Sequence, residues 1–211
     1  MSEQLQSDFD KIVKNSKFSN REIQLKKDFL NKFIESGFPN RKQEDWKFLD
    51  ISQIIKKNIS DLSYFIDYSQ SNKIDPSTFV DGLEHNKIIF LNGRIEKIDF
   101  NHEDQNKIEI IDETKKDISF NYENSLIDLN SAFTDKVFKI LVKKNYSLKK
   151  PLIIYHSTND SIKSTNINLR LDFELGENSC LKLIDYFANN TTKNFINIFY
   201  NFDLKKDSIL K

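Results

Sequence analysis

The side chains that could carry chemistry are few and widely spaced. Three histidines are present, His85, His102 and His156, and no two of them have the spacing of a metal-binding pair. Cys180 is the only cysteine, so no disulfide can form within the chain and a cysteine-based metal site cannot close within it. The sequence therefore predicts no catalytic residue, no cofactor-binding residue and no metal ligand.

Two of these residues have alternative interpretations. His156 ends an apolar segment, which favours a surface or hydrogen-bonded core histidine over a ligand or a base. Cys180 lies in a segment of alternating apolar character, where a cysteine usually packs as a small apolar side chain. A thiol used in metal or sulfur chemistry is the alternative, so the roles of His156 and Cys180 stay open.

Neither the paired acids nor the glycines of the sequence support an enzymatic function. Asp172 and Glu174 have the spacing of two carboxylates on one strand face, which could serve sugar hydrolysis. They alternate with Asn168 and Arg170, so a solvated strand face is the favoured interpretation. The 4 glycines are too scattered for a phosphate-binding loop or a nucleophile elbow.

The composition indicates which classes of partner and which cellular compartment to expect. The 211 residues include 32 basic and 32 acidic side chains, and this balance favours neither nucleic acid nor an anionic membrane surface. The sequence lacks a run of about 18 apolar residues, so no transmembrane helix is predicted. The first residues are acids and amides instead of the basic start and apolar run of a signal peptide. We therefore expect a cytoplasmic protein.

Helices are predicted in the first third of the chain. Apolar side chains at helical spacing predict a first amphipathic helix, and they are Leu5, Phe9, Ile12 and Val13. Ser19 and Glu22 form a capping box that begins a second helix, and Gly37 ends it. A third helix is predicted over 44–57.

Beyond residue 86 apolar side chains no longer have helical spacing and recur at every second residue, as in a β-strand. Asn92-Gly93 predicts a hairpin between strands 88–91 and 94–98. Further strands are predicted over 107–111, 137–142, 152–156, 167–175, 180–187 and 195–204, with a short helix over 123–134. Regularly spaced strands with polar turns indicate a sandwich or a β-solenoid, and periodicity alone does not choose between them.

The segment from Gly37 to Phe48 is the richest in distinctive residues. It holds the only tryptophan, Trp46, and the i, i+4 spacing of Arg41 and Asp45 predicts a local ion pair beside a buried indole. The segment resembles the N-terminal signature of SufD proteins, G-[LF]-P-[TN]-R-[RK]-x-E-[ED]-W-[KR]-[YF], with Phe48 in the aromatic position.

Further stretches resemble the same family in the same order. They are Phe90–Arg94 with its Asn-Gly turn, Leu129–Phe133 with Asp135 and Val137, Pro151–His156, and Arg170–Tyr186. The chain is therefore identified as a member of the SufD family, and it corresponds to the N-terminal portion of SufD proteins.

This resemblance implies an α+β, mainly β fold. An N-terminal helical domain would cover 1–84, and a right-handed parallel β-helix, truncated at Lys211, would occupy 85–211. The resemblance also implies a scaffold subunit for iron–sulfur cluster biogenesis with no enzymatic activity of its own. It would pair with a SufB-like subunit and a SufC-like ATPase. No cofactor is expected on this chain, and a cluster is expected only in the full complex, because the ligands proposed for the family lie later in its β-helix.

Two alternatives remain from the residues alone. One is a β-helix enzyme acting on carbohydrate, and the other is a generic β-rich interaction module. The last predicted strand ends a few residues before Lys211, which would leave an apolar strand edge uncovered. The sequence therefore predicts either a fragment or a partner that covers this edge.

Overall fold

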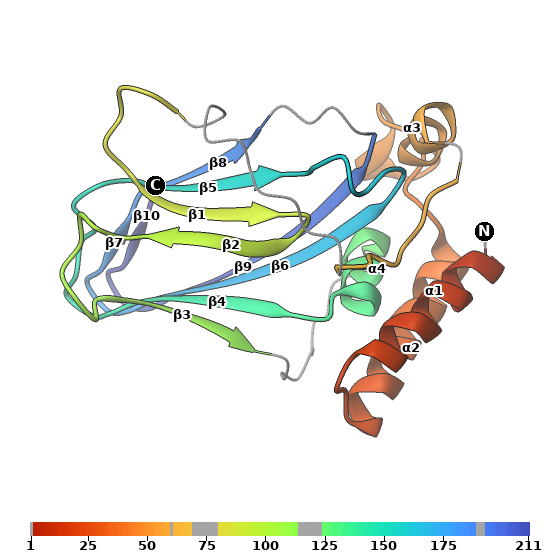
Figure 1. Cartoon of the computed structure of the whole chain (residues 1–211), viewed down its shortest axis with the longest axis horizontal. Coiled ribbons are helices and arrows are strands. Elements are labelled where there is room, and N and C mark those ends of the chain that lie inside the picture. The colour runs from red at the N-terminus through yellow and green to blue at the C-terminus, as the bar shows by residue number, and fades with distance from the viewer. Residues whose placement is uncertain (1, 60, 69–79, 114–123, 189–192) are drawn as a thin grey trace.

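The computed structural model describes residues 2–59, 61–68, 80–113, 124–188 and 193–211. Helices gather at one end of the molecule, and two four-stranded sheets extend from them toward the other end (Figure 1). Among the described residues no helix is long and apolar enough to cross a membrane.

The first two predicted helices are confirmed as α1, Ser2–Asn15, and α2, Asn20–Ser36. The capping box is present, since the Glu22 N–H donates to Ser19 Oγ at 3.3 Å and the Ser19 N–H donates to Glu22 Oε2 at 2.7 Å. Gly37 follows α2 with φ +67°, and its N–H donates to the Phe33 carbonyl at 2.7 Å. A positive φ favours glycine, which explains why the helix ends here.

The single helix predicted over 44–57 is wrong. A short 3-10 turn, η1, covers Glu44–Trp46, and a separate helix, α3, covers Ile51–Asn58. Asp50 divides them, because its carboxylate accepts the Gln53 N–H at 2.8 Å and so caps a new helix.

The strands form two mixed sheets and a short pair. The first sheet has the order β2-β1-β5-β8, with β1 at Asn86–Leu91, β2 at Arg94–Asp99, β5 at Leu152–Ser157 and β8 at Leu183–Phe187. The second has the order β3-β4-β6-β9, with β3 at Ile108–Glu113, β4 at Val137–Val142, β6 at Asn166–Leu175 and β9 at Phe195–Leu204. The pair joins β7, Cys180–Leu181, to β10, Ile209–Leu210.

The predicted right-handed parallel β-helix is wrong. β1 and β2 are antiparallel, as are β3 and β4, whereas β1-β5-β8 and β4-β6-β9 are parallel. The described sheets are therefore mixed, with no closed or solenoid sheet, and the fold is a mixed α/β fold. The predicted hairpin contributes to this result, because Asn92 and Gly93, at φ +52° and +81°, reverse the chain in the tight turn that antiparallel pairing needs.

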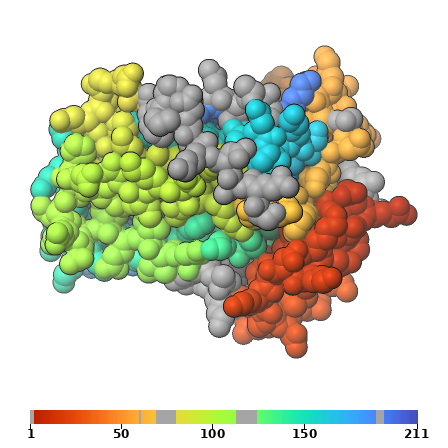
Figure 2. All heavy atoms as spheres, in the orientation of Figure 1, coloured from red at the N-terminus to blue at the C-terminus, as the bar shows by residue number. Residues whose placement is uncertain are grey.

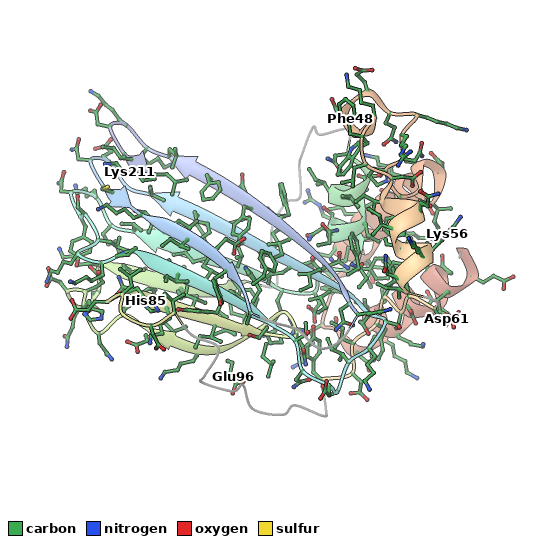
Figure 3. All side chains as sticks on the ribbon, turned by 90° about the horizontal axis from the view of Figure 1, so that it is seen from above. Phe48, Lys56, Asp61, His85, Glu96 and Lys211 are labelled. Carbon is green, nitrogen blue, oxygen red and sulfur yellow. The ribbon has the colours of Figure 1, made fainter. Side chains whose placement is uncertain are left out.

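The main core lies between the two sheets. Side chains of alternate residues on β1, β4, β5 and β6 meet there, among them Phe90, Ile140, Ile154, Leu171 and Phe173. Figure 3 shows side chains filling the space between the sheets.

The predicted strand over 180–187 is divided at Lys182 into β7 and β8.

A second core lies under the helices. The short predicted helix is confirmed as α4, Ser125–Phe133, and it packs against α2. Asn130 on α4 fixes this helix to the sheet, because its side-chain amide donates to the carbonyls of Leu169 at 3.0 Å and Asn197 at 2.9 Å. The helical core thus draws on both predicted domains, and the boundary between 84 and 85 stays a prediction.

Candidate functional site

The outer edge of the second sheet carries core-type side chains that the described structure covers only in part. β9 pairs with β6 along its full length, so Phe202 lies beside Phe173. The two rings are stacked with centroids 5.1 Å apart, yet Phe173 is 1% exposed and Phe202 is 37% exposed. Leu204 and its neighbour Leu175 differ in the same way.

The first sheet ends in the same manner at β8. Phe187 is 51% exposed, whereas its register partner His156 on β5 is buried. Ile184 on β8 and Ile209 on β10 are exposed as well. The outer edges of both sheets therefore carry exposed apolar side chains. We call these outer strands together with β10 the β8–β9 edge and define it by Ile184, Phe187, Phe202, Leu204 and Ile209.

The opposite edges are protected by charge. β2 has four charged residues among its six, and β3 has three among its six. β9 has one charged residue, Asp203, among ten. Charged edge strands discourage pairing with another chain, and the β8–β9 edge lacks that protection. Figure 2 views the molecule from the protected side, where residues of β2 and β3 cover much of the visible surface.

His156 is buried and hydrogen-bonded. Its Nε2 lies 2.7 Å from Asp185 Oδ1 on β8 and 3.1 Å from Tyr200 Oη on β9. The Tyr200 hydroxyl also donates to Asp185 Oδ1 at 2.7 Å. Burial, and then the Asp185 carboxylate, raise the pKa of Tyr200 above its ordinary value. The imidazole is stacked between the rings of Phe90 and Phe187.

The other residues singled out for chemistry are not brought together. His85 is buried and bonded, with Nε2 at 2.7 Å from Tyr155 Oη and Nδ1 at 2.6 Å from the Leu83 carbonyl. His102 is half-buried in a turn. Cys180 on β7 is only half-buried, so its expected burial is incomplete. Within the described ranges, no three His, Cys, Asp or Glu side chains form a metal-binding group.

The acids of β6 are engaged by cations. Arg170 donates to Asp172 through Nε at 2.9 Å and through Nη2 at 3.0 Å, and Lys139 pairs with Glu174 at 2.6 Å. Arg170 and Asp172 are buried, so the predicted solvated face is wrong at these two positions. A bidentate pair holds the two opposite charges together, which offsets part of the cost of burying them.

The signature segment lies on the surface of the helical end. Phe48 is 87% exposed, and Figure 3 shows it projecting there. Trp46 is half-buried and not a core residue, so the predicted buried indole is wrong. Arg41 and Asp45, both described, form no ion pair, and the local pair is Lys47–Glu44 at 2.9 Å. The 3-10 turn disrupts the α-helical spacing that the predicted pair required.

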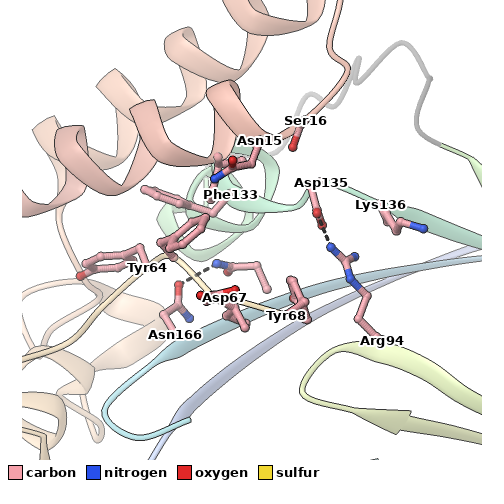
Figure 4. Close-up of a pocket in the computed structure, with 14 residues that line it drawn as sticks. Asn15, Ser16, Tyr64, Asp67, Tyr68, Arg94, Phe133, Asp135, Lys136 and Asn166 are labelled. Atoms are coloured by element: carbon pink, nitrogen blue, oxygen red, sulfur yellow. Dashed lines mark hydrogen bonds and ion pairs between the residues drawn. The ribbon is translucent and has the colours of Figure 1, made fainter. Parts of the chain in front are cut away.

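A cavity of about 650 Å³ lies between α1, residues 64–68, the end of α4 and the starts of β2 and β6 (Figure 4). Arg94 forms an ion pair with Asp135 in this cavity, and its guanidinium lies 4.1 Å from the ring centre of Tyr68. Burial raises the pKa of Tyr68 to about 12, and the Arg94 charge opposes that shift. Sequence reasoning missed this cavity because its walls come from several distant segments.

The chain was compared with known proteins. No protein-family model matches it, and no curated protein matches it either. A function for this chain is therefore inferred from the β8–β9 edge and the residues beside it.

Proposed function

We propose that the chain is a SufD-type scaffold subunit for iron–sulfur cluster assembly, and that it binds a SufB-like subunit through the β8–β9 edge. The observation that carries this proposal is the exposure of core-type side chains on strands with few charges. The order of the SufD-like segments along the sequence supports the choice of family. In this proposal the chain has no enzymatic activity of its own, and it acts in the cytoplasm.

Strand addition gives a physical basis for this binding. An edge strand presents unpaired N–H and C=O groups that an extended segment of a partner can pair with. Alternate residues of β9, from Ile196 to Leu204, face the inner side. The positions between them carry Asn197, Asn201 and Asp203 together with Phe195 and Phe199. A partner strand with the same alternation would extend the sheet and cover Phe202 and Leu204 together.

The rest of the complex follows from the resemblance. A SufC-like ATPase would join the assembly, and the iron–sulfur cluster would be the product that the complex builds. This proposal assigns the cluster to the whole complex and places no cluster ligand on this chain.

The experiment is an anaerobic co-purification. The tagged chain is co-expressed with its SufB-like and SufC-like neighbours, and the eluate is analysed by size-exclusion chromatography with iron and sulfide assays. A stoichiometric complex that contains iron and sulfide is the expected result. Elution of the chain alone at every salt concentration would contradict the proposal, and so would a complex formed only between copies of this chain.

A further inference from the structure

Three polar side chains, those of His156, Asp185 and Tyr200, meet at the rim of the core beside the β8–β9 edge. His156 takes the register position between Phe90 on β1 and Phe187 on β8. Asp185 occupies the register position next to Ile154 of β5, whose side chain belongs to the core between the sheets. Apolar residues flank them on these strands, so the buried imidazole of His156 stands where packing favours an apolar side chain, and the carboxylate of Asp185 lies at the exposed rim.

Packing alone does not require a polar side chain at the buried position of His156. A buried polar group costs stability unless it is hydrogen-bonded, and an apolar replacement of similar size often packs equally well. Residues that break the local pattern without a structural gain concentrate at functional sites. The position of His156 and Asp185 therefore points to a ligand.

The donor atoms have the spacing of metal ligands. His156 Nε2, Asp185 Oδ1 and Tyr200 Oη form a triangle with sides of 2.7, 2.7 and 3.1 Å. Ligand bonds of about 2.0–2.2 Å in an octahedral complex place neighbouring donor atoms roughly 3 Å apart. The three atoms thus match one face of an octahedron without a change of backbone.

We propose that His156, Asp185 and Tyr200 bind a metal ion, and that ferric iron is the ion their chemistry fits best. Imidazole suits iron, carboxylate suits hard cations, and a tyrosine oxygen is a known ligand of iron in proteins. On binding, the Tyr200 phenol releases its proton to solvent, and the imidazole binds through its unprotonated Nε2. Bonds to the ion then replace the hydrogen bonds among the three groups.

The site is open on the side of the β8–β9 edge. The side chain of Asp185 is 34% exposed, and Tyr200 is half-buried. The ring of Phe187, 5.0 Å from the imidazole, fixes one face of His156 and is itself exposed. An ion can therefore enter from solvent and keep water as its remaining ligands. This inference does not depend on the proposed partner.

The test uses the whole 211-residue chain. The purified protein is titrated with ferric citrate, desalted, and examined by visible absorption, resonance Raman spectroscopy and iron analysis. We expect one iron per chain and a visible tyrosinate-to-iron charge-transfer band. Tyr200→Phe removes the phenol oxygen and should abolish the band, and Asp185→Asn should weaken iron binding by about tenfold or more.

Tyr186→Phe is the matched control. Tyr186 is on the same strand as Asp185 but packs against Tyr155 on the other face of the sheet, so this variant should keep the band. A band that persists in Tyr200→Phe would overturn the proposal. Circular dichroism verifies the fold of each variant. If Tyr200→Phe does not fold, the wild-type Raman spectrum decides, because iron retained without tyrosinate modes would also overturn the proposal.

Discussion

The ring of Phe202 on β9 is stacked on the ring of Phe173 on β6, with an interplanar angle of 25°. Phe173 is core, and Phe202 repeats its position one strand further out, where the described residues cover it only in part. The edge strand β9 therefore carries an aromatic side chain of the kind that fills the core. This relationship between two residues is the basis for assigning a binding role to the β8–β9 edge.

Phe202→Glu should weaken binding to the SufB-like subunit by about tenfold or more, because a charge on the edge opposes strand addition. The change should also lower the free energy of unfolding by about 1–2 kcal/mol, because the Phe202 ring is only 37% exposed and is stacked on Phe173. Isothermal titration calorimetry measures the binding, and urea unfolding measures the stability.

Ile111→Glu is the control for this prediction. Ile111 lies on β3, at the other edge of the same sheet, and it is 37% exposed, as Phe202 is. The control should leave the affinity unchanged. Equal losses in both variants would show that the effect is not specific to the β8–β9 edge.

Asp185→Leu should lower the free energy of unfolding by about 1–3 kcal/mol, because it leaves the polar atoms of His156 and Tyr200 without their shared acceptor. The double variant Asp185→Leu/His156→Phe should recover part of that loss, since it removes both members of the His156–Asp185 pair. Urea unfolding of the single and double variants tests the coupling. Strictly additive losses would argue against this prediction.

Lys26 should make stability depend on pH. It is buried, and its Nζ donates to the carbonyls of Ser131, at 3.0 Å, and Thr134 at the end of α4. Burial lowers its pKa from 10.5 to about 8, although Asp135 and Glu22 oppose this shift. Between these values the unfolded chain holds more protons than the folded one, so stability rises with pH.

Between pH 7.5 and 9.5 the wild type should gain roughly 2 kcal/mol from this group. Lys26→Met should lack that gain. Denaturant unfolding of both proteins at the two pH values measures how much the free energy of unfolding changes with pH. Subtracting the change in Lys26→Met from that in the wild type removes the contribution of other titrating groups. Parallel pH profiles for the two proteins would show that Lys26 does not titrate in this window.

Asp8 should contribute stability at neutral pH. It is buried on α1 and accepts hydrogen bonds from Lys11 at 2.8 Å, Gln4 at 2.8 Å and the Tyr64 N–H at 2.9 Å. Burial alone would raise its pKa, but these bonds outweigh burial and lower it below 3.8. The folded chain thus releases this proton more readily than the unfolded one, and the stability is lost as pH falls through the lowered pKa.

Asp8→Asn should cost about 1–3 kcal/mol at pH 7. Its stability should also fall less than that of the wild type on acidification below pH 4. Thermal unfolding against pH measures both effects. Asp10→Asn, an exposed change on the same helix, is the control and should follow the wild type.

Much of the local structure could be predicted from the sequence. The Ser19 capping box and the Asn92-Gly93 turn act through neighbouring residues, and both occur as predicted. Strand pairing could not be predicted, because alternation shows which side chains point inward and is the same for parallel and antiparallel neighbours. The partners of His156 lie 29 and 44 residues away, so periodicity could not identify them.

The burial of polar side chains also depends on distant residues. Arg170 and Asp172 occupy the polar side of an alternating strand, and only the packing of neighbouring elements covers them. Trp46 shows the reverse, because its type suggested a core position that the short turn at Glu44–Trp46 does not provide.

Amide hydrogen exchange of this chain, free and in complex with the proposed SufB-like subunit, tests whether a partner strand pairs with the β8–β9 edge. We predict slower exchange in the complex over Phe195–Leu204 and Leu183–Phe187, with Ile108–Glu113 unchanged, because a partner strand would pair with the β8–β9 edge. Protection confined to the helical end, with β8 and β9 exchanging as in the free chain, would contradict the account.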